Sequence, residues 1–84
     1  MKFEEFRNLQ IKYFSEIHRI LIKYGMKPVS IYYQNNYIVE EQIYYAVFID
    51  QNNHLHALYL TFSKNKRNLE QFEKAVKEIA REEQ

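Results

Sequence analysis

Two histidines and a nearby carboxylate, His54, His56 and Asp50, form the first group in this sequence that could bind a metal. Side chains two residues apart in a strand point to the same side. A strand through His54 and His56 would therefore present two imidazoles together, and imidazole with carboxylate is a ligand set for zinc or nickel. Two histidines beside a hairpin more often form a polar surface. We therefore expect no metal or cofactor and keep His54 and His56 as weak metal-ligand candidates.

A second candidate is the basic run "SKNKR", which contains Lys64, Lys66 and Arg67 directly before a predicted helix. Cations beside the N–H groups of a helix start can bind phosphate. The alternative is a solvated loop whose charges are neutralised by nearby acids such as Glu70 and Glu73. The first helix would add Lys12, Arg19 and Lys23, on its side away from the core, to a modest nucleic-acid patch.

Enzyme chemistry has little support in the sequence. The chain contains no cysteine, and its single glycine excludes a glycine-rich phosphate loop. Metal-dependent nucleases need an acid and a Glu-x-Lys on adjacent strands. Glu40-Glu41-Gln42 is the nearest approach and lacks the lysine. We predict that the protein is not an enzyme.

The chain has 84 residues, enough for one domain, which we place at 1–84. The spacing of its apolar residues predicts the helices and strands that position the candidate residues. Apolar residues with helical spacing predict a long helix over residues 2–24, ended by Gly25 with Pro28 just beyond. Residues 69 onward return to helical spacing, and Asn68 with Gln71 fits a capping box.

Between the helices, β-branched and aromatic residues predict three strands, in "VSIYYQ", "QIYYAVFI" and "HLHALYLTF". The polar cluster "DQNN", residues 50–53, predicts a turn that joins the last two strands. The fold class is therefore α+β, with the order α-β-β-β-α. We expect two layers, a three-stranded antiparallel sheet with both helices packed on one face. The other face is left uncovered.

Positively charged residues are absent from the predicted sheet. Residues 29–62 contain no Lys or Arg, although exposed strands usually carry lysine to prevent association. Tyrosine-rich surfaces that lack charge are typical of protein contacts. A single tyrosine here could equally be a half-buried core residue, but as a set they predict an interface. Its members are Tyr32, Tyr33, Tyr44, Tyr45 and Tyr59.

The first helix has a wider apolar arc than one sheet needs. Ile11, Phe14, His18 and Ile22 form a stripe beside the core arc. Either the helix is half-sunk between the sheet and the second helix, or the stripe is a second contact surface. We therefore predict a homodimer that forms through this stripe or through a sheet edge.

Element order and two local features, "YGMKPVSIYY" and "SKNKRNLEQFEKAVKEIA", resemble the double-stranded RNA-binding domain over roughly residues 17 to 82. The shared features are a proline just before the first strand and a basic cluster that opens the second helix. This resemblance implies an α-β-β-β-α fold in which Lys64, Lys66 and Arg67 grip phosphates across the major groove.

These patterns favour a small non-catalytic binding protein that contacts a protein partner through its tyrosine-rich sheet face, as a homodimer. The Ile, Lys, Asn and Tyr bias is typical of a low-GC phage or mobile element. An accessory or inhibitor protein that binds a host factor, as in anti-defence, fits this origin. The alternative is a nucleic-acid binder. No apolar run approaches the roughly 20 residues of a membrane span, so we expect no membrane contact and a cytoplasmic location, in the host cell if the protein is phage-encoded.

Overall fold

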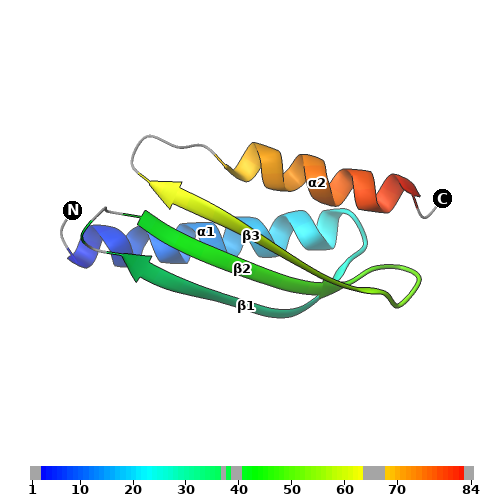
Figure 1. Cartoon of the computed structure of the whole chain (residues 1–84), viewed down its shortest axis with the longest axis horizontal. Coiled ribbons are helices and arrows are strands. Elements are labelled where there is room, and N and C mark those ends of the chain that lie inside the picture. The colour runs from blue at the N-terminus through cyan, green and yellow to red at the C-terminus, as the bar shows by residue number, and fades with distance from the viewer. Residues whose placement is uncertain (1–2, 37, 39–40, 64–67, 83–84) are drawn as a thin grey trace.

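The computed structural model describes residues 3–36, 38, 41–63 and 68–82. The predicted order of elements is confirmed (Figure 1). The elements are α1 (Phe3–Lys23), β1 (Lys27–Asn36), β2 (Glu41–Ile49), β3 (Leu55–Ser63) and α2 (Leu69–Glu82). The molecule is elongated, 43 × 21 × 17 Å, because the long α1 lies along the strands.

The predicted end of the first helix is confirmed by its hydrogen bonds. The Met26 N–H donates to the Leu21 carbonyl at 2.9 Å, and the Gly25 N–H donates to the Ile22 carbonyl at 3.1 Å. Gly25 has φ +76°, the left-handed conformation that glycine adopts without a Cβ clash. The chain thereby reverses within three residues and enters β1 with Met26 buried.

The sheet is a meander with the strand order β1-β2-β3, both pairs antiparallel. The β2–β3 register is regular over the whole of both strands, whereas the β1–β2 register shifts between Pro28 and Ser30. Burial alternates along β2, from Gln42 to Phe48, as expected for a central strand with one covered face.

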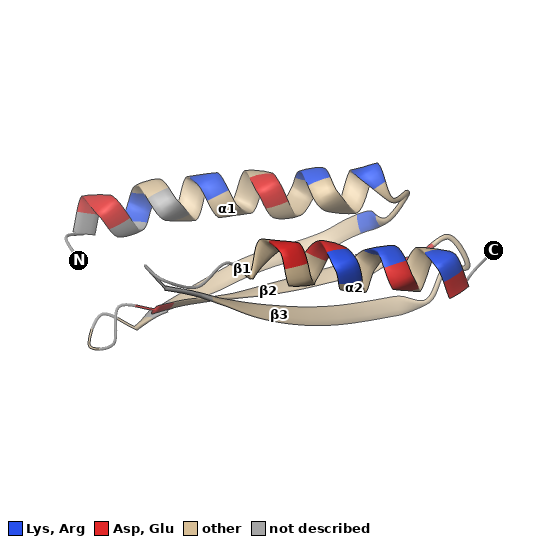
Figure 2. Cartoon of the chain, turned by 90° about the horizontal axis from the view of Figure 1, so that it is seen from above, with Lys and Arg blue, Asp and Glu red and all other residues tan. Residues whose placement is uncertain are grey.

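Both helices lie on that covered face, as predicted (Figure 2). α1 packs mainly over β1 and β2, while α2 packs against α1 and β3. The core between the layers brings together residues from both helices and the sheet. Its buried apolar members are Ile17, Ile20, Leu21, Met26, Tyr44, Ala46, Phe48, Leu60, Phe72 and Val76.

The second helix begins at the predicted position. The Asn68 carbonyl accepts from the Phe72 N–H at 3.0 Å, which is the first helical hydrogen bond. The Asn68 side-chain amide donates to the Thr61 carbonyl, so Asn68 ties the start of α2 to strand β3. In the described residues, neither helix has the length and apolar character to cross a membrane.

Candidate binding surface

The open face is the side of the sheet turned away from the helices. Its positions follow from the alternation in β2 and from the register with β1 and β3. They are Ser30, Tyr32 and Gln34 on β1, Ile43, Tyr45, Val47 and Ile49 on β2, and Leu55, Ala57, Tyr59 and Thr61 on β3. We use the name open face for this set.

Three tyrosines cross the open face in one row. Tyr45 lies directly opposite Tyr32 on one side and Tyr59 on the other. The rings of Tyr32 and Tyr45 are stacked, with centroids 4.9 Å apart and planes 14° from parallel. Tyr59 is 74% exposed and Tyr32 is 51% exposed. The row therefore presents aromatic surface and hydroxyl groups to a partner.

Aliphatic and small side chains continue the open face toward the β2–β3 hairpin. Val47 lies between Ser30 and Ala57, and the next position pairs Ile49 with Leu55, which is 67% exposed. The sequence prediction did not include these residues, because aliphatic side chains in a strand are equally typical of the core. The alternation of Ile43, Tyr45, Val47 and Ile49 is the signal that identifies them.

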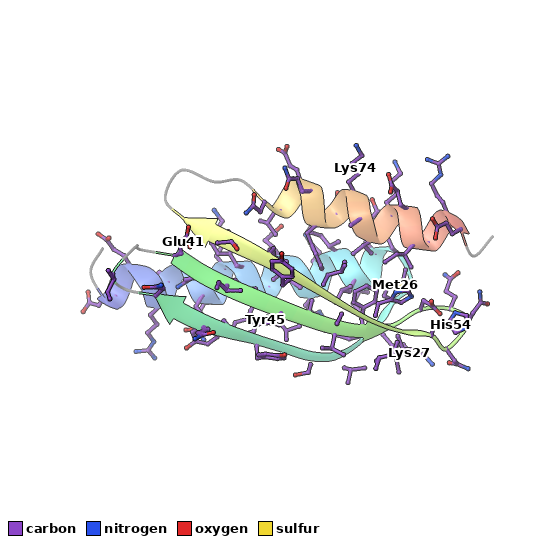
Figure 3. All side chains as sticks on the ribbon, viewed as in Figure 1. Met26, Lys27, Glu41, Tyr45, His54 and Lys74 are labelled. Atoms are coloured by element: carbon purple, nitrogen blue, oxygen red, sulfur yellow. The ribbon has the colours of Figure 1, made fainter. Side chains whose placement is uncertain are left out.

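Charged residues lie only at the two ends of this surface within the described strands. Lys27 pairs with Ile49 at one end, and Glu41 pairs with Asn36 at the other. Figure 3 labels both ends, with Tyr45 between them. Apart from Lys27, the Lys and Arg residues in the described part of the chain lie on the two helices (Figure 2). An exposed apolar and aromatic patch of this kind marks an interaction site.

Two tyrosines predicted for the interface lie on the other side of the sheet. Tyr44 is fully buried and contacts the rings of Tyr13, Phe14 and Tyr33. Tyr33 is half-buried and packs edge-on against Phe14. Because adjacent strand residues point to opposite faces, each Tyr-Tyr pair supplies one core residue and one surface residue. Placing Tyr44 in an interface was wrong, and Tyr33 belongs to the covered face.

The predicted α1 stripe is mostly exposed. Ile11 is 58% exposed, Ile22 is 54% exposed, and His18 is exposed between them. Phe14 differs because it is half-buried, with its ring against Tyr33 and Tyr44. The stripe is therefore a second apolar surface, and Phe14 forms its border with the core.

The histidine pair belongs to the β2–β3 turn. Asp50 is 2% exposed, and its Oδ1 accepts from the N–H groups of Asn52 at 2.8 Å and His54 at 2.9 Å. Its Oδ2 lies 2.6 Å from His56 Nε2 and 3.7 Å from His54 Nδ1. The Asp50 carboxylate thus stabilises the turn by accepting hydrogen bonds from two of its backbone N–H groups. Among the described residues, no group of three or more His, Asp or Glu side chains could hold a metal ion.

The predicted cation patch is only partly within the described residues, because Lys64, Lys66 and Arg67 lie outside them. On α1, Arg19 pairs with Glu16 at 2.8 Å, and Lys23 lies 3.4 Å from Glu73 of α2. Lys12 lies 5.9 Å from the centre of the Tyr13 ring. Glu16 raises the pKa of Arg19 through a hydrogen bond and through its charge. Two of these three cations thus already have acidic partners.

No protein-family model matches this chain, and neither the curated proteins nor the solved structures yielded a match.

Proposed function

We propose that this protein is a small non-catalytic binding module that docks on a partner protein through the open face. The observation that carries this proposal is the tyrosine row, in which Tyr32 and Tyr45 stack and Tyr59 lies opposite Tyr45, with no cation between the ends of the surface at Lys27 and Glu41. Tyrosine provides a large contact area with few rotatable bonds, and its hydroxyl can bond to polar groups at a contact. An accessory or inhibitor protein of a phage or mobile element that binds a host factor has this character.

The test compares capture of partner proteins by three forms of the chain. The first is unchanged, the second carries Tyr32→Ser and Tyr59→Ser, and the third carries Lys74→Ser and Lys77→Ser on the outer side of α2. We expect a partner that binds the first and third forms and is lost from the second. Tyr32 and Tyr59 should also be protected from hydroxyl-radical labelling in the complex. A partner that binds all three forms equally would contradict a role for the open face.

The second candidate is nucleic-acid binding. The observation in its favour is the α-β-β-β-α order together with the exposed cations Lys12, Arg19 and Lys23 along α1. Titration with duplex RNA and duplex DNA at two salt concentrations distinguishes the two candidates. Binding that requires Lys64, Lys66 and Arg67 would favour the second. We place it behind protein binding because Arg19 and Lys23 already have acidic partners.

A further inference from the structure

We propose that a second copy of this chain binds along the free edge of β1 and the exposed stripe of α1. The two β1 strands then pair antiparallel about a two-fold axis, and the two α1 helices pack side by side. This inference goes beyond the proposed function because it uses a different surface from the open face. Its product is one six-stranded sheet whose two open faces form a continuous surface.

The first step is the direction of the backbone groups in β1. The Asp50 N–H donates to the His54 carbonyl at 2.9 Å, so even-numbered residues of β2 bond toward β3 and odd-numbered residues bond toward β1. With the β1–β2 register, the N–H and C=O groups of Ile31, Tyr33 and Asn35 then point away from β2. β1 is an outer strand, so these groups form a free edge.

The second step is that this edge lacks the usual protection against pairing. Exposed edges are normally blocked by lysine, proline or a bulge. In β1, the lysine (Lys27), the proline (Pro28) and the register shift between Pro28 and Ser30 all lie at the start of the strand. The remaining stretch, Ser30–Asn36, is regular and uncharged. The β3 edge differs, because the side-chain amide of Asn68, directly before α2, donates to the outward carbonyl of Thr61.

The third step is the helix stripe beside this edge. Ile11 and Ile22 are more than half exposed, and Ser15 and His18 are exposed between them. A shallow, open depression of about 430 Å³ lies between the stripe and β1, lined by Phe14, Ser15, His18 and Ile31. The free edge and the apolar stripe are therefore one continuous surface on the side of α1 opposite α2.

The fourth step identifies the occupant as a second copy. A surface that meets itself must be neutral at its centre and complementary at its ends. Ser30–Asn36 is centred on Tyr33, whose ring lies 5.5 Å from that of Phe14 near the middle of the stripe. An axis at Tyr33 places Ile11 of one copy near His18 of the other. It also sets the acidic first turn of α1, with Glu4, beside the basic last turn, with Lys23.

The spacing of the layers agrees with this arrangement. Paired strands lie about 4.8 Å apart, and α1 packs over β1 and β2, inward from the edge. Two copies of α1 would then lie roughly two strand spacings apart, about 10 Å, which is close to the usual distance between packed helices of about 8–10 Å. Strand pairing and helix packing can therefore form together without a shift of either layer.

The test is the molar mass of the protein in solution, measured by light scattering over a wide concentration range. The unchanged chain should be a dimer. Ile11→Glu and, separately, Ile22→Glu should shift it to monomer, because each places a charge in the helix contact, and the second also lies beside the acidic first turn of the other copy. Leu55→Glu is the matched control, since it changes an aliphatic residue of the open face that is also more than half exposed, and it should leave the dimer intact.

Hydrogen exchange identifies the edge that pairs. The amides of Ile31 and Tyr33 should be protected in the dimer and should exchange at least tenfold faster in the Ile11→Glu monomer, with circular dichroism confirming that the variant is folded. A monomer at every concentration, or a dimer in which these amides stay unprotected, overturns the proposal. Neither result bears on the proposed function, because the tyrosine variants of the open face test that separately.

Discussion

At the scale of single residues, Gln42 and Tyr44 form a buried polar pair whose burial is costly without a hydrogen bond. Both side chains lie on the covered face of β2, at 1% and 0% exposure. The Tyr44 hydroxyl donates to Gln42 Oε1 at 2.6 Å, so two polar groups that would be costly to bury satisfy each other. Burial raises the pKa of Tyr44 above its usual value, and the neighbouring Tyr13 and Tyr33 add to the rise.

Tyr44→Phe should lower the free energy of unfolding by about 1–2 kcal/mol, because the buried hydrogen bond from the Tyr44 hydroxyl to Gln42 Oε1 is lost. The pH dependence has a definite sign. A free tyrosine loses its proton near pH 10, whereas Tyr44 in the folded chain keeps its proton to higher pH. The unfolded state therefore binds fewer protons in that window, and the Tyr44 contribution to stability is complete below it and falls as pH rises through it.

Urea unfolding from pH 8 to 11.5 measures both effects. The Tyr44→Phe variant should lose less stability above about pH 10 than the unchanged chain does. Tyr45→Phe, on the open face, is the control and should change neither quantity much. An equal alkaline loss in the unchanged chain and in the Tyr44→Phe variant would contradict the assignment.

Asp50→Ala should lower the free energy of unfolding by about 1–3 kcal/mol, because the N–H groups of Asn52 and His54 both lose their acceptor in the β2–β3 turn. Asn52→Ala is the matched control, since only its backbone N–H takes part in the hydrogen bond to Asp50. Thermal unfolding of the two variants makes the comparison. A similar loss in both would mean that the turn depends on general polarity rather than on the Asp50 carboxylate.

At the scale of elements, periodicity predicted the helices and strands because each has one covered face. The α2 stripe is an example, with Phe72 and Val76 buried as expected. Periodicity could not tell which tyrosine of each adjacent pair faces the core. Exchanging the faces of a strand preserves its alternation, and only the register and the position of α1 decide that Tyr44 is inside and Tyr45 outside. The aliphatic part of the open face was missed for a related reason, because Val47 and Leu55 look like core residues in sequence.

Gly25 is the residue on which the α1–β1 connection depends. Its φ of +76° disfavours any residue with a side chain, and a Cβ there would lie 2.5 Å from Gln51 Nε2. Gly25→Ala should therefore lower the free energy of unfolding by about 1–3 kcal/mol. The double variant Gly25→Ala with Gln51→Ala separates the causes. If the loss disappears in the double variant, the contact with Gln51 was the cause and the backbone conformation was not.

At the scale of the whole molecule, charge and aromatic surface are segregated. Among the described residues, the helices carry every Lys and Arg except Lys27, while the open face and the β1 stretch Ser30–Asn36 are uncharged (Figure 2). The sequence predicted this segregation, because charge composition can be counted along the chain. It could not place the exposed stripe of α1 on the same side as the β1 edge, since that depends on how α1 rotates on the sheet. Which kind of partner binds therefore depends on surfaces that form only when α1 packs on the sheet.

Salt dependence should distinguish the two kinds of partner. Contact through the uncharged open face releases few counterions, so affinity for a protein partner should change less than threefold when salt is raised several-fold. Binding of duplex nucleic acid through Lys12, Arg19 and Lys23 alone would give a slope of log affinity against log salt of roughly −3. Titration calorimetry at three salt concentrations measures this slope, with the Tyr32→Ser and Tyr59→Ser variant as the control for the open face. A steep slope for the partner would move the binding site away from the open face, because the cations that such a slope requires lie on the helices and in the run of Lys64, Lys66 and Arg67.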